Sequence, residues 1–376
     1  MIHEAPDVME IRAAVLRATN SPLSAETLEL AAPSDGEVLI EVKASGVCHS
    51  DWHVVTGDSE VDLPVVLGHE GSGVVAELGP GVEDLAVGDH VALSWIPFCG
   101  SCRACTHGHT NLCQAYLPAL WAGTMLDGTR RLTDATGEPV HHLSAISTWA
   151  THAVVPAISC IKMPDIPFEI SALIGCAVTT GVGAALNKAK VRAGSTVVVF
   201  GGGGVGLSIV MGAAWAGAAE IIVVDRNPAK EALARSFGAT QFIAGGDGVD
   251  PVALVRDLTG GVGADYAFDA VGNTDVATQV VETVGQFGMA VLVGLPRPGS
   301  TFAVDPTRLI RDEKTVTGSI FGSAHTHRDF VEYARLYGDG KLPLDRLITG
   351  RYELDQVNEA CQDMLEGAVG RGVIVF

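Results

Sequence analysis

The sequence predicts an α/β protein in which a strand-rich first part precedes a doubly wound parallel sheet. Over the first 160 residues, short apolar runs lie between glycine- and proline-rich turns. From about residue 178, apolar and β-branched runs alternate with helical patterns, which is typical of a parallel sheet covered on both faces. A glycine-rich turn directly follows the first of these later runs, as it does in many sheets of this kind.

Three segments of the first part, 36–46, 71–81 and 87–94, read as strands of a small barrel. They alternate apolar with polar residues, or run apolar between glycines. The second part contains further apolar strand candidates: 195–201, 220–225, 240–244, 264–272, 289–295 and 314–320.

A helix is expected over 227–238, between two of these candidates. Asn227 is placed to cap it, Pro228 suits its first turn and Gly238 ends it. After residue 320 the pattern is that of helices and loops to the C-terminus.

The composition argues against two classes of partner. Acidic residues outnumber basic ones by 44 to 24, for a formal charge of −20. Such a surface repels phosphate backbones and anionic membranes, so neither nucleic acid nor a membrane is expected as a partner. The first 20 residues lack the basic start and apolar run of a secretory signal, and no uninterrupted apolar stretch reaches membrane-spanning length. These features predict a cytoplasmic protein, in which clustered cysteines are metal ligands rather than disulfides.

Gly201, Gly203 and Gly206 form the pattern G-x-G-x-x-G between an apolar strand and an apolar helix. Glycines here let the backbone approach a pyrophosphate, whose charge meets the positive end of the helix. Asp225 lies 19 residues after Gly206, at the end of the next strand candidate. Its carboxylate would accept hydrogen bonds from an adenosine ribose and repel a 2′-phosphate, which predicts NAD rather than NADP. The alternative is a plain glycine-rich turn with a surface aspartate.

Four cysteines, Cys99, Cys102, Cys105 and Cys113, lie within one short segment. Four thiolates at this spacing can surround one zinc ion tetrahedrally. The alternatives are two disulfides, which a reducing compartment disfavours, or four unlinked thiols. Because protein ligands would fill all four positions, this zinc is expected to be structural.

Cys48, His69 and Cys176 are candidates for a second metal site. They lie in the glycine-flanked segments GVCHSD, GHE and IGCAVTTGVG. Two thiolates and an imidazole leave one position of a zinc ion open, as in a catalytic site. Three dispersed ligands are a weak signature, so ordinary core and loop positions are the alternative. Cys160 and Cys361 fit small buried residues.

The motifs GVCHSD, GHEGSGVV, the four-cysteine segment, GCAVTTG, GGGGVG and VVD occur in this order along the chain. In these motifs, and essentially from end to end, the sequence closely resembles zinc-containing alcohol dehydrogenases of the medium-chain dehydrogenase/reductase family. The resemblance implies a GroES-like, β-rich catalytic domain over 1–177, with a structural zinc lobe at 95–115. It also implies a Rossmann NAD-binding domain over 178–320 and a C-terminal segment, 321–376, that completes the catalytic domain.

The resemblance implies a role for each matching residue. Cys48, His69 and Cys176 match the ligands of the catalytic zinc, and Cys99, Cys102, Cys105 and Cys113 match those of the structural zinc. The residues that match groups around the catalytic zinc are Glu70, which can approach the metal, Asp51, which orients the histidine ligand, and Ser50 and His53, the two protein ends of a proton relay. The residues that match the cofactor site are Asp225 and Lys230 at the ribose, His49 and Arg371 at the pyrophosphate, and Thr180 and Val205 at the nicotinamide. Trp95 and Leu295 match the substrate pocket.

The implied activity is reversible hydride transfer between an alcohol and NAD, giving an aldehyde or a ketone, with two zinc ions per chain. Zinc would acidify the bound alcohol, Ser50 would accept its proton, and the cofactor ribose and His53 would pass it to solvent. A plain surface or core role is the alternative for His53, and also for His49, since a neutral imidazole is a poor phosphate partner.

Two related activities stay open on the same resemblance. Thiol-dependent formaldehyde dehydrogenases share the layout, but Leu117 stands where their glutathione form relies on an arginine. Nicotinoprotein alcohol dehydrogenases hold NAD permanently and exchange electrons with a second substrate. A non-catalytic NAD-binding module or a zinc-free reductase would be expected to have lost Cys48, His69 or Cys176, and the chain keeps all three.

A homodimer joined through the Rossmann domains is expected, and further pairing into tetramers stays open. The run 289–295 and the segment 300–310 resemble the part of the family's cofactor domain that pairs across a two-fold axis. An apolar strand at a sheet edge needs cover, which a second copy would supply. The other expected partner is a small-molecule alcohol or aldehyde.

Overall fold

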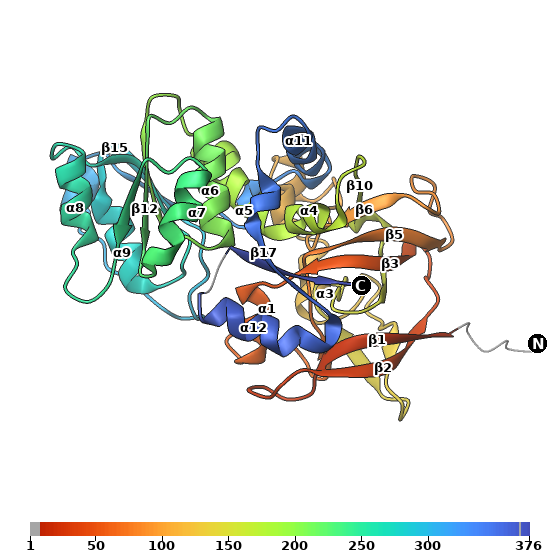
Figure 1. Cartoon of the computed structure of the whole chain (residues 1–376). Coiled ribbons are helices and arrows are strands. Elements are labelled where there is room, and N and C mark those ends of the chain that lie inside the picture. Colours follow the sequence, from red (N-terminus) through yellow and green to blue (C-terminus); the bar gives the residue numbers. More distant parts are fainter. Residues whose placement is uncertain (1–7, 368–369) are drawn as a thin grey trace, which may run out of the picture. The chain divides into compact units, whose positions relative to one another are not determined.

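The computed structural model describes residues 8–367 and 370–376, and the chain divides into two compact units (Figure 1). The first unit comprises the chain up to Cys176 together with His325–Asp339 and Ile348–Phe376. The second comprises Ala177–Ala324 and Gly340–Leu347. Gly340–Leu347 therefore belongs to the second unit, although its neighbours on both sides belong to the first.

A closed barrel forms one part of the first unit. Its strands, in barrel order, are β1 (Val8–Leu16), β2 (Ser24–Ala31), β7 (Leu132–Thr133), β8 (Pro139–His142) and β4 (Val65–Val66). β1 and β2 pair antiparallel, with Val8 opposite Ala31 and Val15 opposite Ser24. Ile11, Leu28 and Val66 are buried together in the core of this barrel.

A second sheet in this unit carries much of the candidate site. Its strand order is β10 (Cys160–Lys162), β6 (His90–Leu93), β5 (Gly71–Leu78), β3 (Glu37–Gly46), β18 (Arg371–Val375) and β17 (Ile348–Tyr352), and β9 (His152–Pro156) also pairs with β3. β3, β5 and β6 confirm the strands predicted at 36–46, 71–81 and 87–94.

Two strands lie where the sequence predicted helices and loops. β17 and β18 pair in parallel, and β18 pairs antiparallel with β3, with Val373 opposite Gly46. The expectation for the chain after residue 320 was wrong in this part. The run RGVIV is short and its partner strand lies far away in the sequence, so no local pattern distinguishes it from a loop.

Short helices connect the strands of the first unit and carry several candidate site residues. They are α1 (His49–Val55), α2 (Arg103–Thr106), α3 (Leu117–Trp121), α4 (Phe168–Leu173), α11 (Thr326–Gly338) and α12 (Val357–Leu365).

The second unit contains one parallel sheet. Its order is β13 (Gln241–Ala244), β12 (Glu220–Asp225), β11 (Thr196–Phe200), β14 (Ala264–Asp269), β15 (Val284–Leu292) and β16 (Thr315–Gly318). The chain builds outward from β11 in one direction and then returns to build outward from β14 in the other. This is the predicted doubly wound sheet, and its direction changes between β11 and β14.

Helices follow most of these strands. They are α6 (Gly204–Trp215), α7 (Glu231–Ser236), α8 (Pro251–Leu258), α9 (Thr274–Thr283) and α10 (Pro306–Arg311), and α5 (Thr179–Gly183) precedes β11. The helix predicted over 227–238 is present as a short 3₁₀ turn and α7, and the Asn227 side chain accepts a hydrogen bond from the backbone N–H of Ala229. Val198, Ile222 and Val280 lie in the core between sheet and helices.

The run 289–295 is not an edge strand, contrary to expectation. Its part 289–292 forms the end of β15, which pairs with β14 on one side and with β16 on the other. The edge on this side of the sheet is the four-residue β16, which lies within the strand candidate 314–320. The sheet-edge argument for a dimer therefore does not apply to this run.

One helical stretch, Phe168–Ala189, is long and apolar enough to cross a membrane by length and composition. The expectation that no apolar stretch reaches that length overlooked it. In the structure 83% of its most apolar window is buried in the protein, as in the core helix of a folded domain.

Candidate active site

Four side chains that can bind a metal converge in the first unit. They are Cys48, His69, Glu70 and Cys176, all buried, and their ligand atoms lie within 4.8 Å of one another. Cys48 directly precedes α1, and His69 and Glu70 directly precede β5. Cys176 lies in a π-helical turn, Ile174–Val178, a local irregularity that often occurs at functional sites.

Asp51 orients His69 from within α1. Its Oδ1 atom lies 3.1 Å from His69 Nδ1 and also accepts a hydrogen bond of 2.9 Å from the backbone N–H of Gly68. Nε2 is therefore the ring nitrogen left for a metal, the arrangement usual for metal-binding histidines. Burial opposes a charge on His69, but the negative charges of Asp51 and Cys48 outweigh it and raise its pKa.

The chemistry of this donor set fits zinc. Cys48 and Cys176 are free cysteines, and two thiols with one imidazole form a Cys₂His set that leaves a coordination position open. The thiol of Cys176 donates a hydrogen bond that lowers the pKa of Cys48 and raises its own. One negative sulfur is thus stabilised by the protein alone, and a cation would allow both to ionise.

The carboxylate of Glu70 is paired with the guanidinium of Arg371. The guanidinium donates hydrogen bonds to both carboxylate oxygens, from Nε at 3.2 Å and from Nη2, and both side chains are almost completely buried. Sequence reasoning placed Arg371 at a pyrophosphate and missed this pair. It also missed Gly46, where a Cβ atom would lie 1.9 Å from Glu70 Oε2, so that only glycine admits the Glu70 side chain.

The two predicted ends of the relay, Ser50 and His53, lie on α1. The Cys48 thiol points to Ser50 Oγ at 3.6 Å, which brings this hydroxyl next to the metal group. His53 lies one turn further along the helix and is partly exposed, with Nδ1 3.6 Å from Asp58 Oδ2.

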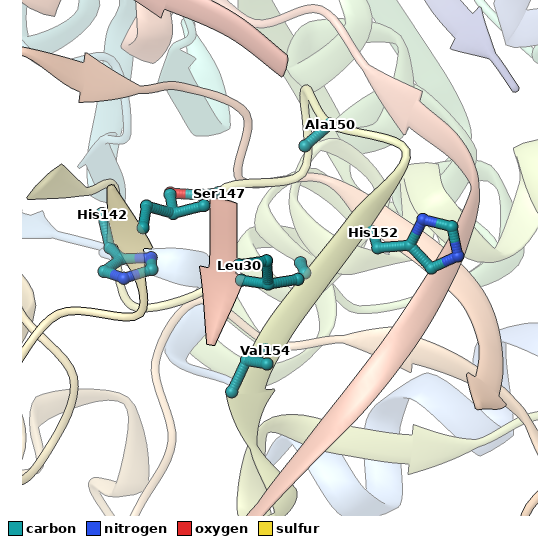
Figure 2. A pocket seen from close by; sticks show the side chains of 8 residues that line it. Leu30, His142, Ser147, Ala150, His152 and Val154 are labelled. Carbon is teal, nitrogen blue, oxygen red and sulfur yellow. The ribbon is translucent and has the colours of Figure 1, made fainter. Parts of the chain in front are cut away.

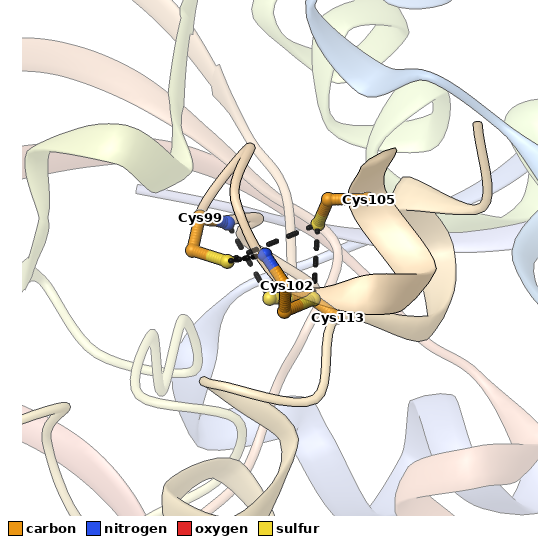
Figure 3. Close-up of side chains that lie close together, drawn as sticks. All are labelled: Cys99, Cys102, Cys105 and Cys113. Carbon is orange, nitrogen blue, oxygen red and sulfur yellow. Dashed lines mark hydrogen bonds between the residues drawn. The ribbon is translucent and has the colours of Figure 1, made fainter. Parts of the chain in front are cut away.

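The four-cysteine segment forms a separate group, shown in Figure 3. The sulfurs of Cys102 and Cys105 are 3.5 Å apart, and those of Cys99 and Cys105 are 4.0 Å apart. Four sulfurs at about 2.3 Å from one zinc would lie roughly 3.8 Å from each other, so the group fits a tetrahedral ion. A hydrogen bond from Ser101 lowers the pKa of Cys99 to about 6, whereas burial raises that of Cys105 to about 12.

The glycine-rich turn lies between β11 and α6 in the second unit. Gly201 has φ +99°, and α6 begins directly after Gly203. A Cβ atom on Gly206 would lie 1.7 Å from the carbonyl oxygen of Gly201, so the helix can approach the strand only with glycine there. A Cβ atom on Gly203 would meet nothing within 4 Å, which leaves space above this turn for a ligand.

Asp225 ends β12, the neighbouring strand, and faces this turn. Its Oδ2 atom accepts hydrogen bonds from the backbone N–H of Gly202 at 2.7 Å and from Lys230 Nζ at 3.0 Å. The backbone N–H of Asn227 donates to Oδ1 at 2.8 Å. The carboxylate is therefore fixed at the carboxyl end of the sheet, where ligands of doubly wound folds bind.

The remaining predicted residues lie on helices or just after a strand. His49 begins α1 and is exposed, Thr180 is buried in α5, and Val205 lies in the first turn of α6. Leu295 follows β15 and is 53% exposed.

Trp95, a predicted pocket residue, lies beside the metal group. Its ring lies 6.1 Å from that of His69, edge to face. Trp121, at the end of α3, stacks edge to face on Trp95 with ring centres 6.5 Å apart and is half exposed. Nothing in the sequence pattern pointed to Trp121, because tryptophan spacing carries no information on such pairing.

A small apolar hollow beside the barrel contains none of the predicted site residues (Figure 2). Leu30, Val154 and His142 are among its lining residues. His142 Nε2 accepts a hydrogen bond from the backbone N–H of Arg131, and burial lowers the pKa of His142 to about 3. This histidine is a neutral core residue.

Comparison with known proteins agrees with this arrangement. Residues 34–165 match the alcohol dehydrogenase GroES-like domain family, and residues 204–337 match the zinc-binding dehydrogenase family. The NDMA-dependent alcohol dehydrogenase of Amycolatopsis methanolica is 41% identical, over 98% of this chain and 99% of that protein. The S-(hydroxymethyl)glutathione dehydrogenase of Paracoccus denitrificans is 38% identical, over 98% of this chain and 100% of that protein. Benzyl alcohol dehydrogenase of Acinetobacter calcoaceticus has a similar crystal structure, with a TM-score of 0.92 and 34% identity over 98% of this chain and 99% of that chain.

Proposed function

The chain belongs to the zinc-binding alcohol dehydrogenases of the medium-chain dehydrogenase family, and on that premise we propose that it oxidises an apolar alcohol to the aldehyde or ketone, reversibly, with NAD. The observation that carries the proposal is the buried group of Cys48, His69 and Cys176, with His69 oriented by Asp51.

Cys48, His69 and Cys176 would hold the catalytic zinc, and Cys99, Cys102, Cys105 and Cys113 a structural one. When bound, zinc supplies Lewis acidity that makes an alcohol proton easier to remove, and NAD supplies the acceptor for hydride. Asp51 keeps His69 in the tautomer that binds a metal through Nε2. Glu70, whose carboxylate lies within 4.8 Å of the candidate ligand atoms and is hydrogen-bonded to Arg371, is proposed as the protein group that can approach the metal.

Ser50 and His53 are proposed to move the proton that the alcohol loses. Ser50 Oγ would accept it beside Cys48, and His53 would exchange it with solvent from the exposed side of α1. Replacing His53 should slow turnover without affecting zinc binding, because the His53 side chain contacts none of the candidate zinc ligands.

NAD is proposed as the cofactor because Asp225 would place a negative charge beside a 2′-phosphate. Gly201, Gly203 and Gly206 would let the pyrophosphate reach the start of α6. The other residues proposed to contact NAD are Lys230 at the ribose, His49 and Arg371 at the pyrophosphate, and Thr180 and Val205 at the nicotinamide.

Trp95 and Leu295 are proposed to contact the substrate. The aromatic ring of Trp95 beside His69 favours an alcohol with a planar apolar body. The similarity to a protein named benzyl alcohol dehydrogenase supports the same choice.

A second candidate is a nicotinoprotein alcohol dehydrogenase that retains NAD and passes its electrons to another substrate. The 41% identity to a protein named NDMA-dependent alcohol dehydrogenase favours it. A thiol-dependent formaldehyde dehydrogenase is less favoured in its glutathione form, because Leu117 offers no charge to a glutathione carboxylate.

We also propose a cytoplasmic homodimer. Phe287 and Ile310, each about three-quarters exposed, lie close together on the second unit, since the Phe287 backbone N–H donates to the carbonyl oxygen of Asp312. Exposed apolar side chains of this size favour cover by a second copy. A monomer in light scattering at micromolar concentration would contradict this assignment.

Purified protein should be assayed with primary, secondary and aromatic alcohols, once with added NAD and once with a nitroso-dye acceptor alone. Turnover that requires added NAD supports the first candidate. Turnover with the dye alone, together with NAD released on denaturation, supports the nicotinoprotein. No alcohol turnover under either condition with fully zinc-loaded protein would refute both.

A further inference from the structure

A carboxylate without an assigned role lies beside His53. Asp58 Oδ2 is 3.6 Å from His53 Nδ1, and the two side chains are 20% and 30% exposed. In the described part of the chain this is the only ion pair that His53 makes. The distance is longer than that of a good hydrogen bond, but it is short enough for the carboxylate to attract a proton on Nδ1 of the ring.

The loop after α1 places this carboxylate through several contacts. Gly57 takes φ +77°, a conformation that favours glycine, and turns the chain back toward the helix. The backbone N–H of Ser59 then donates to the carbonyl oxygen of His53 at 2.9 Å. Thr56 Oγ1 donates to Asp58 Oδ2, also at 2.9 Å. The side chain of Asp58 is therefore directed at His53 by the fold of the loop.

Other charged groups near this helix are accounted for. His49 lies one turn earlier on α1 and is exposed. Helix α12 shares a core cluster with α1, and its acids Glu359 and Asp363 hydrogen-bond to Gln356 and Tyr352. Asp58 is the acid placed to act on His53.

We propose that Asp58 is a positioning residue for His53, which it holds with Nδ1 toward the loop and stabilises while the ring is charged. The proposal rests on the proposed relay role of His53. A neutral His53 with its proton on Nδ1 accepts a second proton at Nε2 and becomes an imidazolium beside the carboxylate. It then releases one proton to water and returns to the neutral form, and Asp58 stays ionised throughout.

Asp58→Asn tests the proposal with little change of shape. The amide oxygen can still accept the hydrogen bond from Thr56, while the negative charge is lost. Glu60→Gln, which removes an exposed acid from the same loop, is the matched control. We expect kcat for alcohol oxidation at pH 7 to fall about three- to tenfold in Asp58→Asn with KM nearly unchanged, as for loss of support to a general base.

A double-variant comparison separates positioning from loss of structure. In a His53→Gln background, Asp58→Asn should have no further effect on kcat. The proposal would be overturned if Asp58→Asn had the same kcat as Glu60→Gln. It would also be overturned if Asp58→Asn lowered kcat by the same factor in the His53→Gln background as in wild type. Zinc content and thermal unfolding should match wild type in every variant.

A readout independent of activity is the ¹⁵N spectrum of the His53 ring, assigned by its absence in His53→Gln. We expect the neutral ring to carry its proton mainly on Nδ1 in wild type and to shift toward Nε2 in Asp58→Asn. An unchanged tautomer overturns the proposal even in an active enzyme. A shifted tautomer in a protein without alcohol dehydrogenase activity supports the Asp58–His53 contact and counts against the proposed function instead.

Discussion

Replacing Arg371 by methionine should strongly destabilise the first unit. Its guanidinium is 6% exposed and makes two hydrogen bonds to Glu70, which is fully buried, so water cannot replace the lost partner. Removing one member of such a pair leaves a buried charge and costs about 3–5 kcal/mol. Urea unfolding of the zinc-loaded protein, followed by tryptophan fluorescence, measures the difference.

The pH dependence of this loss has a definite sign. Burial raises the pKa of Glu70 above its ordinary value of 4.5, and the charge of Arg371 is the largest protein influence that opposes that shift. A carboxyl group whose pKa is raised in the folded state is tolerated at low pH and becomes destabilising as pH rises through that folded pKa. The deficit of Arg371→Met should therefore grow from pH 4.5 upward.

Two variants control this experiment. Arg12→Met breaks the pair between Arg12 and Asp355, whose side chains are 51% and 69% exposed, and should cost about 0.5 kcal/mol or less. Adding Glu70→Gln to Arg371→Met removes the buried charge and should recover part of the loss. A deficit below about 1 kcal/mol for Arg371→Met, or no recovery in the double variant, would show that the buried-charge reasoning is wrong.

Four further outcomes are expected. Gly206→Ala should destabilise the second unit by several kcal/mol in calorimetry, because its Cβ would meet the Gly201 carbonyl oxygen at 1.7 Å. Gly203→Ala should keep wild-type stability, because its Cβ would meet nothing within 4 Å, but it should weaken NAD binding in a fluorescence titration. Asp225→Ala should narrow the ratio of kcat/KM for NAD over NADP, and comparable values in wild type would refute the role of its charge. Cys102→Ala should remove one zinc by elemental analysis and lower the melting temperature; unchanged stability would argue against a structural ion. His142→Gln should make the free energy of unfolding less dependent on pH in acid. The pKa of His142 is lowered from 6.5 to about 3, so this residue reduces stability by up to about 1.4 kcal/mol per pH unit as pH falls between these values. The same pH dependence in His142→Gln and wild type would contradict a neutral, buried His142.

The sequence predicted the doubly wound sheet well because each of its strands is a local apolar run with its own turn signals. It predicted less well where a strand depends on a distant partner. β18 is recognisable only through its pairing with β3, and the position of β15 in the sheet follows from β16, a short strand with two threonines. A hydrophobic pattern indicates which side of a helix or strand is buried, but it does not indicate which strands lie next to it.

The candidate site, too, was predicted only in part. Residue type made Cys48, His69 and Cys176 candidates, but three dispersed ligands are a weak signature, and the resemblance to zinc-containing alcohol dehydrogenases was needed to name the set. The Glu70–Arg371 pair, the glycine at position 46 and Asp58 beside His53 could not be predicted, because each depends on which side chains meet in space. These contacts decide how the residues named by the motifs are held.

The most direct test of the account is the zinc content of wild type and of Cys48→Ala, measured by elemental analysis on freshly purified protein. Two zinc ions per wild-type chain are predicted, and one in Cys48→Ala, which should keep its fold but lose alcohol turnover. One ion or none in wild type, or two retained by a fully active Cys48→Ala, would contradict a catalytic zinc held by Cys48, His69 and Cys176.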